Sequence, residues 1–217
     1  SITKAPVTSL ITITPTTQQY TDMVTYTTTI TGGAALIAGG PQAAASVTFK
    51  VGTQTIATNV TLLPDGLNLK ATYTAPTGQM SPGSQIIMAV INNPDGNYTI
   101  NNVQPTTALT ITQEDATTDY TGDQIIATSS TTASTATVTL KANISDINVT
   151  NPTGDANPGD IRNAKVKFIV TTLSGAATPY SSTWLPVSTL VTAGDTRTGT
   201  VSYSFIANIG TTATDEE

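Results

Sequence analysis

The chain has 217 residues, enough for two domains of about a hundred residues each. Only 10% of the residues are charged and the formal net charge is −6, so no cationic surface is available for phosphates and nucleic acid is excluded as a partner. There is no His and no Cys, which excludes a Ser-His-Asp triad, a thiol nucleophile and a zinc site of imidazole or thiolate ligands. With one Trp and three Phe there are also too few aromatic side chains to line a glycosidase cleft. We therefore expect a protein without enzymatic activity and without a cofactor, a calcium ion excepted.

Apolar and polar residues alternate in short runs in the first half, and no segment shows a helical period. The 48 Thr residues favour strands, because a branched Cβ suits a pleated, half-buried surface. Turn residues such as Gly52-Thr53 and Pro64-Asp65-Gly66 separate the runs. Seven short strands predict an antiparallel β-sandwich, and their ranges are 8–14, 22–30, 46–51, 54–62, 67–74, 85–92 and 97–103.

The second half repeats parts of the first. LTIT at 109–112 matches LITIT at 10–14, TTDYTGDQII at 117–126 matches TQQYTDMV at 17–24, and NAKVKFIV at 163–170 matches SVTFKV at 46–51. A repeat of roughly a hundred residues predicts two similar β domains in tandem, residues 1–106 and 107–217. TTDYTGDQII and NAKVKFIV lie farther apart in the second half than TQQYTDMV and SVTFKV do in the first. We therefore expect an insertion in the second domain around 147–163.

The order VTFKVGTQTIATNVTL, DGLNLKATY, SPGSQIIMAVINNPDGNYTINN resembles bacterial Ig-like repeat domains (Big-type) of exported cell-surface and adhesin proteins. The resemblance covers about residues 8–106 and is looser in the second half. It departs from the family at Ile91, where such repeats more often carry Tyr. It implies an all-β fold of two tandem Ig-like antiparallel β-sandwich domains and an extracellular, cell-surface location, and it transfers no catalytic residue.

The resemblance implies a structural role, either as a subunit of a surface fibre or as a stalk module of an adhesin. In that family a further strand often follows a segment like SYSFIANIGTTAT, whereas this chain stops at Glu217. An edge left open in this way could accept an extended segment such as SITKAPVTSLITI from a neighbouring chain. We therefore expect head-to-tail self-association or contacts with neighbouring Ig-like domains, with a surface receptor or a glycan as further partners. The longest apolar run, IIMAVI at 86–91, is too short for membrane insertion.

Acidic residues gather in two places. Within the expected insertion, Asp155, Asn157 and Asp160 offer oxygen ligands at loop spacing, which is the chemistry that Ca²⁺ requires. The same residues also suit a solvated turn without an ion. The second group lies at the domain junction, where calcium would stiffen the connection, and consists of Glu114, Asp115, Asp119 and Asp123.

Trp184 has two interpretations. It is either a core residue, the more frequent place for a lone Trp, or a platform for sugar rings together with Tyr180. The platform would make the chain a polysaccharide-binding module of a secreted protein, which is the alternative to the structural role. We expect an exposed Trp184 to favour the platform and a buried one to favour the structural role.

Four Asn-x-Ser/Thr sequons are candidate glycosylation sites, at Asn59, Asn97, Asn143 and Asn148. In a chain so rich in Thr and Asn, several sequons arise by chance. Asn148 is the favoured candidate, because a loop in the expected insertion would expose it.

Overall fold

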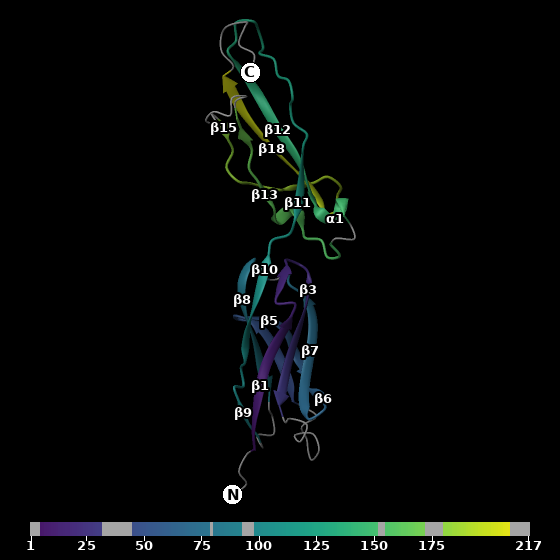
Figure 1. Cartoon of the computed structure of the whole chain (residues 1–217). Helices are drawn as coiled ribbons and strands as arrows, with labels where there is room; N and C mark the ends of the chain where they lie inside the picture. The colour runs from purple at the N-terminus through teal and green to yellow at the C-terminus, as the bar shows by residue number, and fades with distance from the viewer. Residues whose placement is uncertain are drawn as a thin grey trace. The chain divides into compact units, whose positions relative to one another are not determined.

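The computed structural model describes residues 5–31, 45–78, 80–92, 98–151, 155–171 and 180–208. The chain divides into two compact units, Ser1–Gln113 and Glu114–Glu217 (Figure 1). Almost all of the described regular structure is β, which confirms the predicted fold class. The short helices are α1 (Ile147–Thr150) and the 3-10 helix η3 (Ile161–Asn163). No described helix has the length and apolar character needed to cross a membrane.

The described residues of the first unit form two five-stranded sheets. One contains, in spatial order, β6 (Leu63–Asp65), β7 (Asn68–Pro76), β3 (Met23–Thr31), β1 (Ala5–Thr14) and β9 (Tyr98–Asn101). The other contains β2 (Thr17–Gln19), β10 (Thr106–Thr112), β8 (Gly83–Asn92), β4 (Ser46–Val51) and β5 (Gln54–Thr61).

This strand order is that of an Ig sandwich. In Ig nomenclature β1, β3, β7 and β6 are strands A, B, E and D of one sheet, and β10, β8, β4 and β5 are strands G, F, C and C′ of the other. Two pairings are parallel, β1 with β9 and β2 with β10. The predicted hairpin between β4 and β5 turns at Gly52, whose φ of 55° is the left-handed conformation that glycine adopts without strain.

The core of the first unit lies between the two sheets. The alternation predicted for β4 is observed, because Val47 and Phe49 are completely buried. Phe49 meets Tyr26 of β3 with 5.8 Å between the ring centroids. The Tyr26 hydroxyl is buried and has no hydrogen-bond partner in the described part of the chain. Burial, with a smaller contribution from Tyr73, raises the pKa of Tyr26 to about 12.

The second unit repeats half of this architecture. Its four-stranded sheet has the order β11 (Ala116–Tyr120), β12 (Thr135–Asp146), β18 (Thr198–Asn208) and β17 (Thr189–Leu190). The order matches β1, β3, β7 and β6 of the first unit, and neighbouring strands are again antiparallel. The long strands β12 and β18 lie side by side in Figure 1.

The layer facing this sheet is small. It consists of two short ladders, β13 (Lys165–Val166) with β16 (Leu185–Pro186) and β14 (Ile169–Val170) with β15 (Tyr180–Ser181). By sequence and order these strands correspond to β4 and β5. Within residues 114–151, 155–171 and 180–208, no strand corresponds to β8 or β10. The second sheet of this sandwich is therefore incomplete in the described part of the chain.

The small facing layer leaves the inner face of the large sheet unevenly covered. Near one end, Ala142, Ile144 and Val201 pack with Ile161, Phe168 and Val187 in a buried core. Farther along the same ladder, Leu140 and Tyr203 are partly buried against this core and Phe205 is partly buried, whereas Ala136 and Ala207, a pair near the end of the ladder, are buried. Phe168 takes the place that Phe49 has in the first unit, as the match between NAKVKFIV and SVTFKV predicts.

Two predicted boundaries require correction. LTIT at 109–112 lies in β10, which pairs with β8 and β2, so the first unit extends to Gln113 rather than to 106. The extra residues of the second unit are not confined to 147–163. Residues 121–134 separate β11 from β12, whereas only 15–22 separate the corresponding strands β1 and β3.

Candidate functional site

The predicted calcium-binding residues Asp155, Asn157 and Asp160 lie between α1 and η3, but Asp155 and Asp160 do not belong to one acidic group of the described residues. Asp160 binds Arg162, with 2.9 Å from Nε to Oδ1, and this hydrogen bond holds the pKa of Asp160 below its usual value. The backbone N–H of Asn157 donates to Asp155 Oδ1 over 2.9 Å. Of the two acids only Asp155 is buried, with 6% of its surface exposed.

Asp155 lies instead beside Glu114 and Asp146. One carboxylate oxygen from each of these three residues lies within 4.8 Å of the other two. Glu114 is the first residue of the second unit and Asp146 is the last residue of β12. The β11–β12 ladder pairs Ala116 with Asp146, which brings the start of the unit to the end of β12. We call Glu114, Asp146 and Asp155 the acidic cluster.

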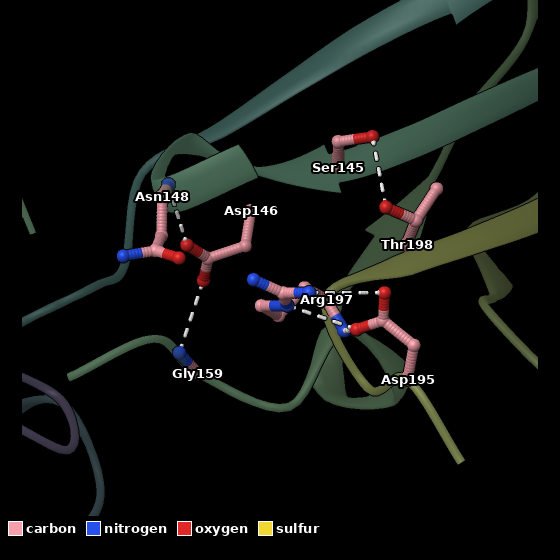
Figure 2. A network of polar contacts seen from close by, with 7 residues as sticks. All are labelled: Ser145, Asp146, Asn148, Gly159, Asp195, Arg197 and Thr198. Carbon is pink, nitrogen blue, oxygen red and sulfur yellow. Dashed lines mark hydrogen bonds and ion pairs between the residues drawn. The ribbon is translucent and has the colours of Figure 1, made fainter. Parts of the chain in front are cut away.

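Backbone N–H groups hold the Asp146 carboxylate in place (Figure 2). Oδ1 accepts from Asn148 over 2.9 Å and so caps the N-terminus of α1, and Oδ2 accepts from Gly159 over 3.0 Å. The Asn148 side-chain amide donates to the backbone carbonyl of Asp155. These contacts tie α1 and the following segment to the end of β12, and they position the acidic cluster.

The acidic cluster concentrates negative charge away from water. Asp146 is 2% exposed, and its pKa is raised, first by burial and then by the neighbouring Asp155, against the lowering effect of the two N–H donors. Asp155 Oδ2 is buried and has no hydrogen-bond partner in the described part of the chain. The nearby Arg197 guanidinium binds Asp195, with 2.9 Å from Nε to Oδ1 (Figure 2). No salt bridge within the described residues includes Asp146 or Asp155.

Asp146 was not predicted as a ligand, although β12 contains a signal for it. Ala142, Ile144 and Asp146 alternate along the strand and each is 2% exposed, so Asp146 occupies a core position. Gly159 allows the close approach of the segment that follows. A Cβ added there would lie 2.9 Å from Glu114 Cγ and 3.7 Å from Asp146 Oδ2.

Trp184 is 65% exposed, so the expected core position is wrong. The adjacent strand β16 pairs only with β13 in the described structure, and the small layer has no further strand to cover the indole. Tyr180 packs against Phe205 with 4.4 Å between ring centroids, and its hydroxyl accepts from the Asn208 backbone N–H over 2.9 Å. No described ring contact joins Trp184 to Tyr180.

The second unit has a groove of about 430 Å³, and part of its lining comes from the residues that follow Trp184 in the sequence. Neither Trp184 nor Tyr180 lines it. Its lining consists of aliphatic, hydroxyl and one cationic side chain, from Lys141, Leu185, Pro186, Ser188, Thr189, Thr200, Val201 and Ser202.

Among the described residues, β13 and β14 pair on one side only, with β16 and β15, and we call their other side the open edge. The Phe168 N–H donates to Ser182 Oγ over 2.9 Å, and the Phe168 carbonyl accepts from the Ser182 N–H over 3.0 Å. Backbone groups of successive residues in an extended strand point in opposite directions, so those of Ile169 point away from β15. In the first unit the corresponding side of β4 pairs with β8. The Ile169 side chain is 60% exposed.

The N-terminal segment expected to act as a donor is already paired. From Ala5 onward it forms β1, which pairs with β3 and β9 of its own unit. Val7, Ile11 and Ile13 of this strand are buried in the core of that unit.

The predicted sequons fall in different environments. Asn59 is exposed in β5, and Asn143 is half-buried in β12. Asn148 is half-buried and its amide is engaged with Asp155, so it is less exposed than expected. Asn97 lies outside the described residues. Glycosylation at these sites stays a prediction.

Comparisons with known proteins give no family. No protein-family model matches the chain, and no curated protein matches it. Among solved structures, one similar chain is the ICAM-5 D1–D4 ectodomain fragment, with a TM-score of 0.34 and 15% identity over 90% of this chain and 46% of that one. Another is Salmonella alpha-2-macroglobulin reacted with methylamine, with a TM-score of 0.27 and 10% identity over 93% of this chain and 13% of that one. The chain thus spans less than half the length of either structure.

Proposed function

We propose that this chain is a non-enzymatic structural module of an extracellular surface filament, in which the second unit accepts a β-strand from a second copy of the chain. The observation that carries the proposal is the open β13–β14 edge, beside a four-stranded sheet that the facing layer covers only in part. The resemblance to bacterial Ig-like repeats supports a place outside the cell. The lack of His and Cys supports a role without catalysis.

The first unit shows which strand such an edge would take. There β8 pairs with β4 in antiparallel register, so that Ile91, Ala89 and Ile87 stand opposite Val47, Phe49 and Val51. The second unit repeats the receiving pattern with Val166, Phe168 and Val170. A strand with alternating apolar residues would therefore cover the partly exposed inner face and satisfy the free backbone groups at once. Segments of this type occur throughout the chain itself, so a second copy fits as the donor.

Replacing Ile169 by proline is expected to prevent assembly, because proline removes the N–H that points to the open edge. The exposed Ser181 stands opposite Ile169 in the β14–β15 ladder. Ser181→Pro therefore removes an N–H that points away from β14, on the side of the ladder opposite to the open edge, and serves as the matched control. Light scattering after size-exclusion chromatography and electron microscopy would compare the two variants with the wild type. We expect filaments or concentration-dependent oligomers from wild type and Ser181→Pro, and monomers from Ile169→Pro.

Circular dichroism would first establish that both proline variants retain the β fold. Wild-type chains that stay monomeric at high concentration would overturn the filament proposal. So would assembly by Ile169→Pro at the wild-type concentration, since the contact would then lie elsewhere.

The exposure of Trp184 favours a second candidate function, binding of a neutral polysaccharide. An exposed indole can stack on a sugar ring, and only 10% of the chain's residues are charged. We expect Trp184→Ala to abolish retention on an immobilised neutral polysaccharide while Trp184→Phe keeps part of it. Affinity electrophoresis through gels that contain the polysaccharide measures the retention. Equal migration of wild type and Trp184→Ala in every gel would remove this candidate.

A further inference from the structure

We propose that Glu114, Asp146 and Asp155 bind one Ca²⁺ ion at the start of the second unit. This site lies within one unit and is independent of strand addition at the β13–β14 edge. It combines Asp155 of the predicted set in the insertion with Glu114 of the acidic group at the junction, and adds Asp146.

The first argument is the state of Asp155. Its side chain is more than nine-tenths buried and contributes a carboxylate oxygen to the acidic cluster, and its Oδ2 has no hydrogen-bond partner in the described residues. A buried carboxylate oxygen without a donor loses its hydrogen bonds to water and forms none with the protein, which is energetically unfavourable. Its neighbour Asp146 is equally buried and belongs to no salt bridge of the described chain. A cation between the carboxylates would compensate both groups.

The second argument is the geometry of the oxygens. Calcium holds its oxygen ligands at about 2.3–2.6 Å, so oxygens on one ion lie up to about 5 Å apart. The three carboxylate oxygens, one from each residue, lie within 4.8 Å of one another and satisfy this limit. Magnesium holds its ligands at about 2.0–2.1 Å in a strict octahedron and usually keeps several waters. An irregular set of three carboxylates, with water as the remaining ligands, therefore favours calcium.

The third argument is that the cluster is held before an ion arrives. The N–H groups of Asn148 and Gly159 fix both oxygens of Asp146, and the Asn157 N–H fixes Oδ1 of Asp155. These donors leave Asp155 Oδ2 available. Gly159 leaves room for Glu114, since a Cβ there would lie 2.9 Å from Glu114 Cγ. The competing arrangement is a proton shared between Asp146 and Asp155, which would need no metal.

Calcium titration of the full chain tests the site. After removal of metals with EDTA at neutral pH, isothermal titration with CaCl₂ is expected to show one bound ion per chain, and MgCl₂ is expected to bind at least about tenfold more weakly. Millimolar Ca²⁺ should raise the unfolding midpoint of the second unit by roughly 5–10 °C. Hydrogen exchange should slow in peptides that contain residues 140–150 and 155–163.

Asp155→Asn keeps the shape of the side chain and removes its charge. We expect it to weaken Ca²⁺ binding by about tenfold or more and to raise the unfolding midpoint in EDTA, because the repulsion from Asp146 is lost. Glu114→Gln is a second variant, at a less buried position, and should also weaken binding. Asp160→Asn is the matched control, since Asp160 lies in the same segment but pairs with Arg162, and its Ca²⁺ affinity should equal that of the wild type.

Absence of both binding heat and a midpoint shift in the wild type would overturn the proposal in favour of the shared proton. An equal Ca²⁺ response in wild type and Asp155→Asn would also overturn it. Neither result depends on whether the chain forms filaments.

Discussion

Replacement of Phe49 by alanine is expected to destabilise the first unit by about 3–5 kcal/mol. Phe49 is completely buried in β4, which lies between β5 and β8, and its ring packs against Tyr26 of the opposite sheet. Truncation removes the contact between the sheets and leaves a cavity that strands paired on both sides can close only in part.

Urea unfolding would measure this loss, with two signals that separate the units. Trp184 is the only Trp and lies in the second unit, so its fluorescence follows that unit, whereas circular dichroism follows both. We expect a large shift in the circular dichroism transition and little change in fluorescence. Leu67→Ala is the control, because Leu67 is 82% exposed and its truncation should cost less than about 0.5 kcal/mol. A loss below about 1 kcal/mol for Phe49→Ala would contradict the predicted role of this ring.

Replacement of Gly199 by alanine is expected to destabilise the second unit by about 1–3 kcal/mol. A Cβ at Gly199 would lie 2.3 Å from Val187 Cγ1, 3.1 Å from the Thr189 carbonyl oxygen and 3.2 Å from Ile161 Cγ2. Val187 is 1% exposed and Ile161 is also buried, so neither side chain can move into solvent. The β17–β18 pairing or the small facing layer must therefore shift.

Trp184 fluorescence during thermal unfolding would measure the effect, and Ser202→Ala, an exposed position on the same strand, is the control. The clash with Val187 gives a further test by a double-mutant cycle. Val187→Ala should cost less in the Gly199→Ala background than in the wild type, because it removes the clashing methyl group. Additive costs would show that the destabilisation arises elsewhere.

The strands of the first unit could be predicted from the sequence because each has one buried face. The predicted range 46–51 coincides with β4, and 54–62 and 85–92 differ from β5 and β8 by one or two residues at the ends. The strands β2 and β6 were not predicted, since three residues are too short to show a period. The boundary between the units was misplaced because LTIT of β10 has the composition of LITIT in β1.

The second unit was harder to predict because its short strands carry little pattern. Strands β13 to β17 have two residues each, and an incomplete layer leaves Trp184 exposed where an isolated Trp is usually buried. The acidic cluster could be predicted only in part. Asp155 lies in a recognisable loop, but Glu114 is distant from it in sequence, and the β11–β12 ladder is what brings Glu114 to Asp146.

The parallel pairing of β2 with β10 determines how the first unit bears tension. Thr17 to Gln19 lie beside Thr110 to Thr112, and the bonds from Tyr20 N to Thr112 O and from Thr110 N to Thr16 O extend the contact at both ends. A pull on the chain before β2 and after β10 moves parallel neighbours in opposite directions along their axes. The bonds between them are then sheared together rather than opened one after another. In the proposed filament, this arrangement would strengthen the module against pulling without any additional burial.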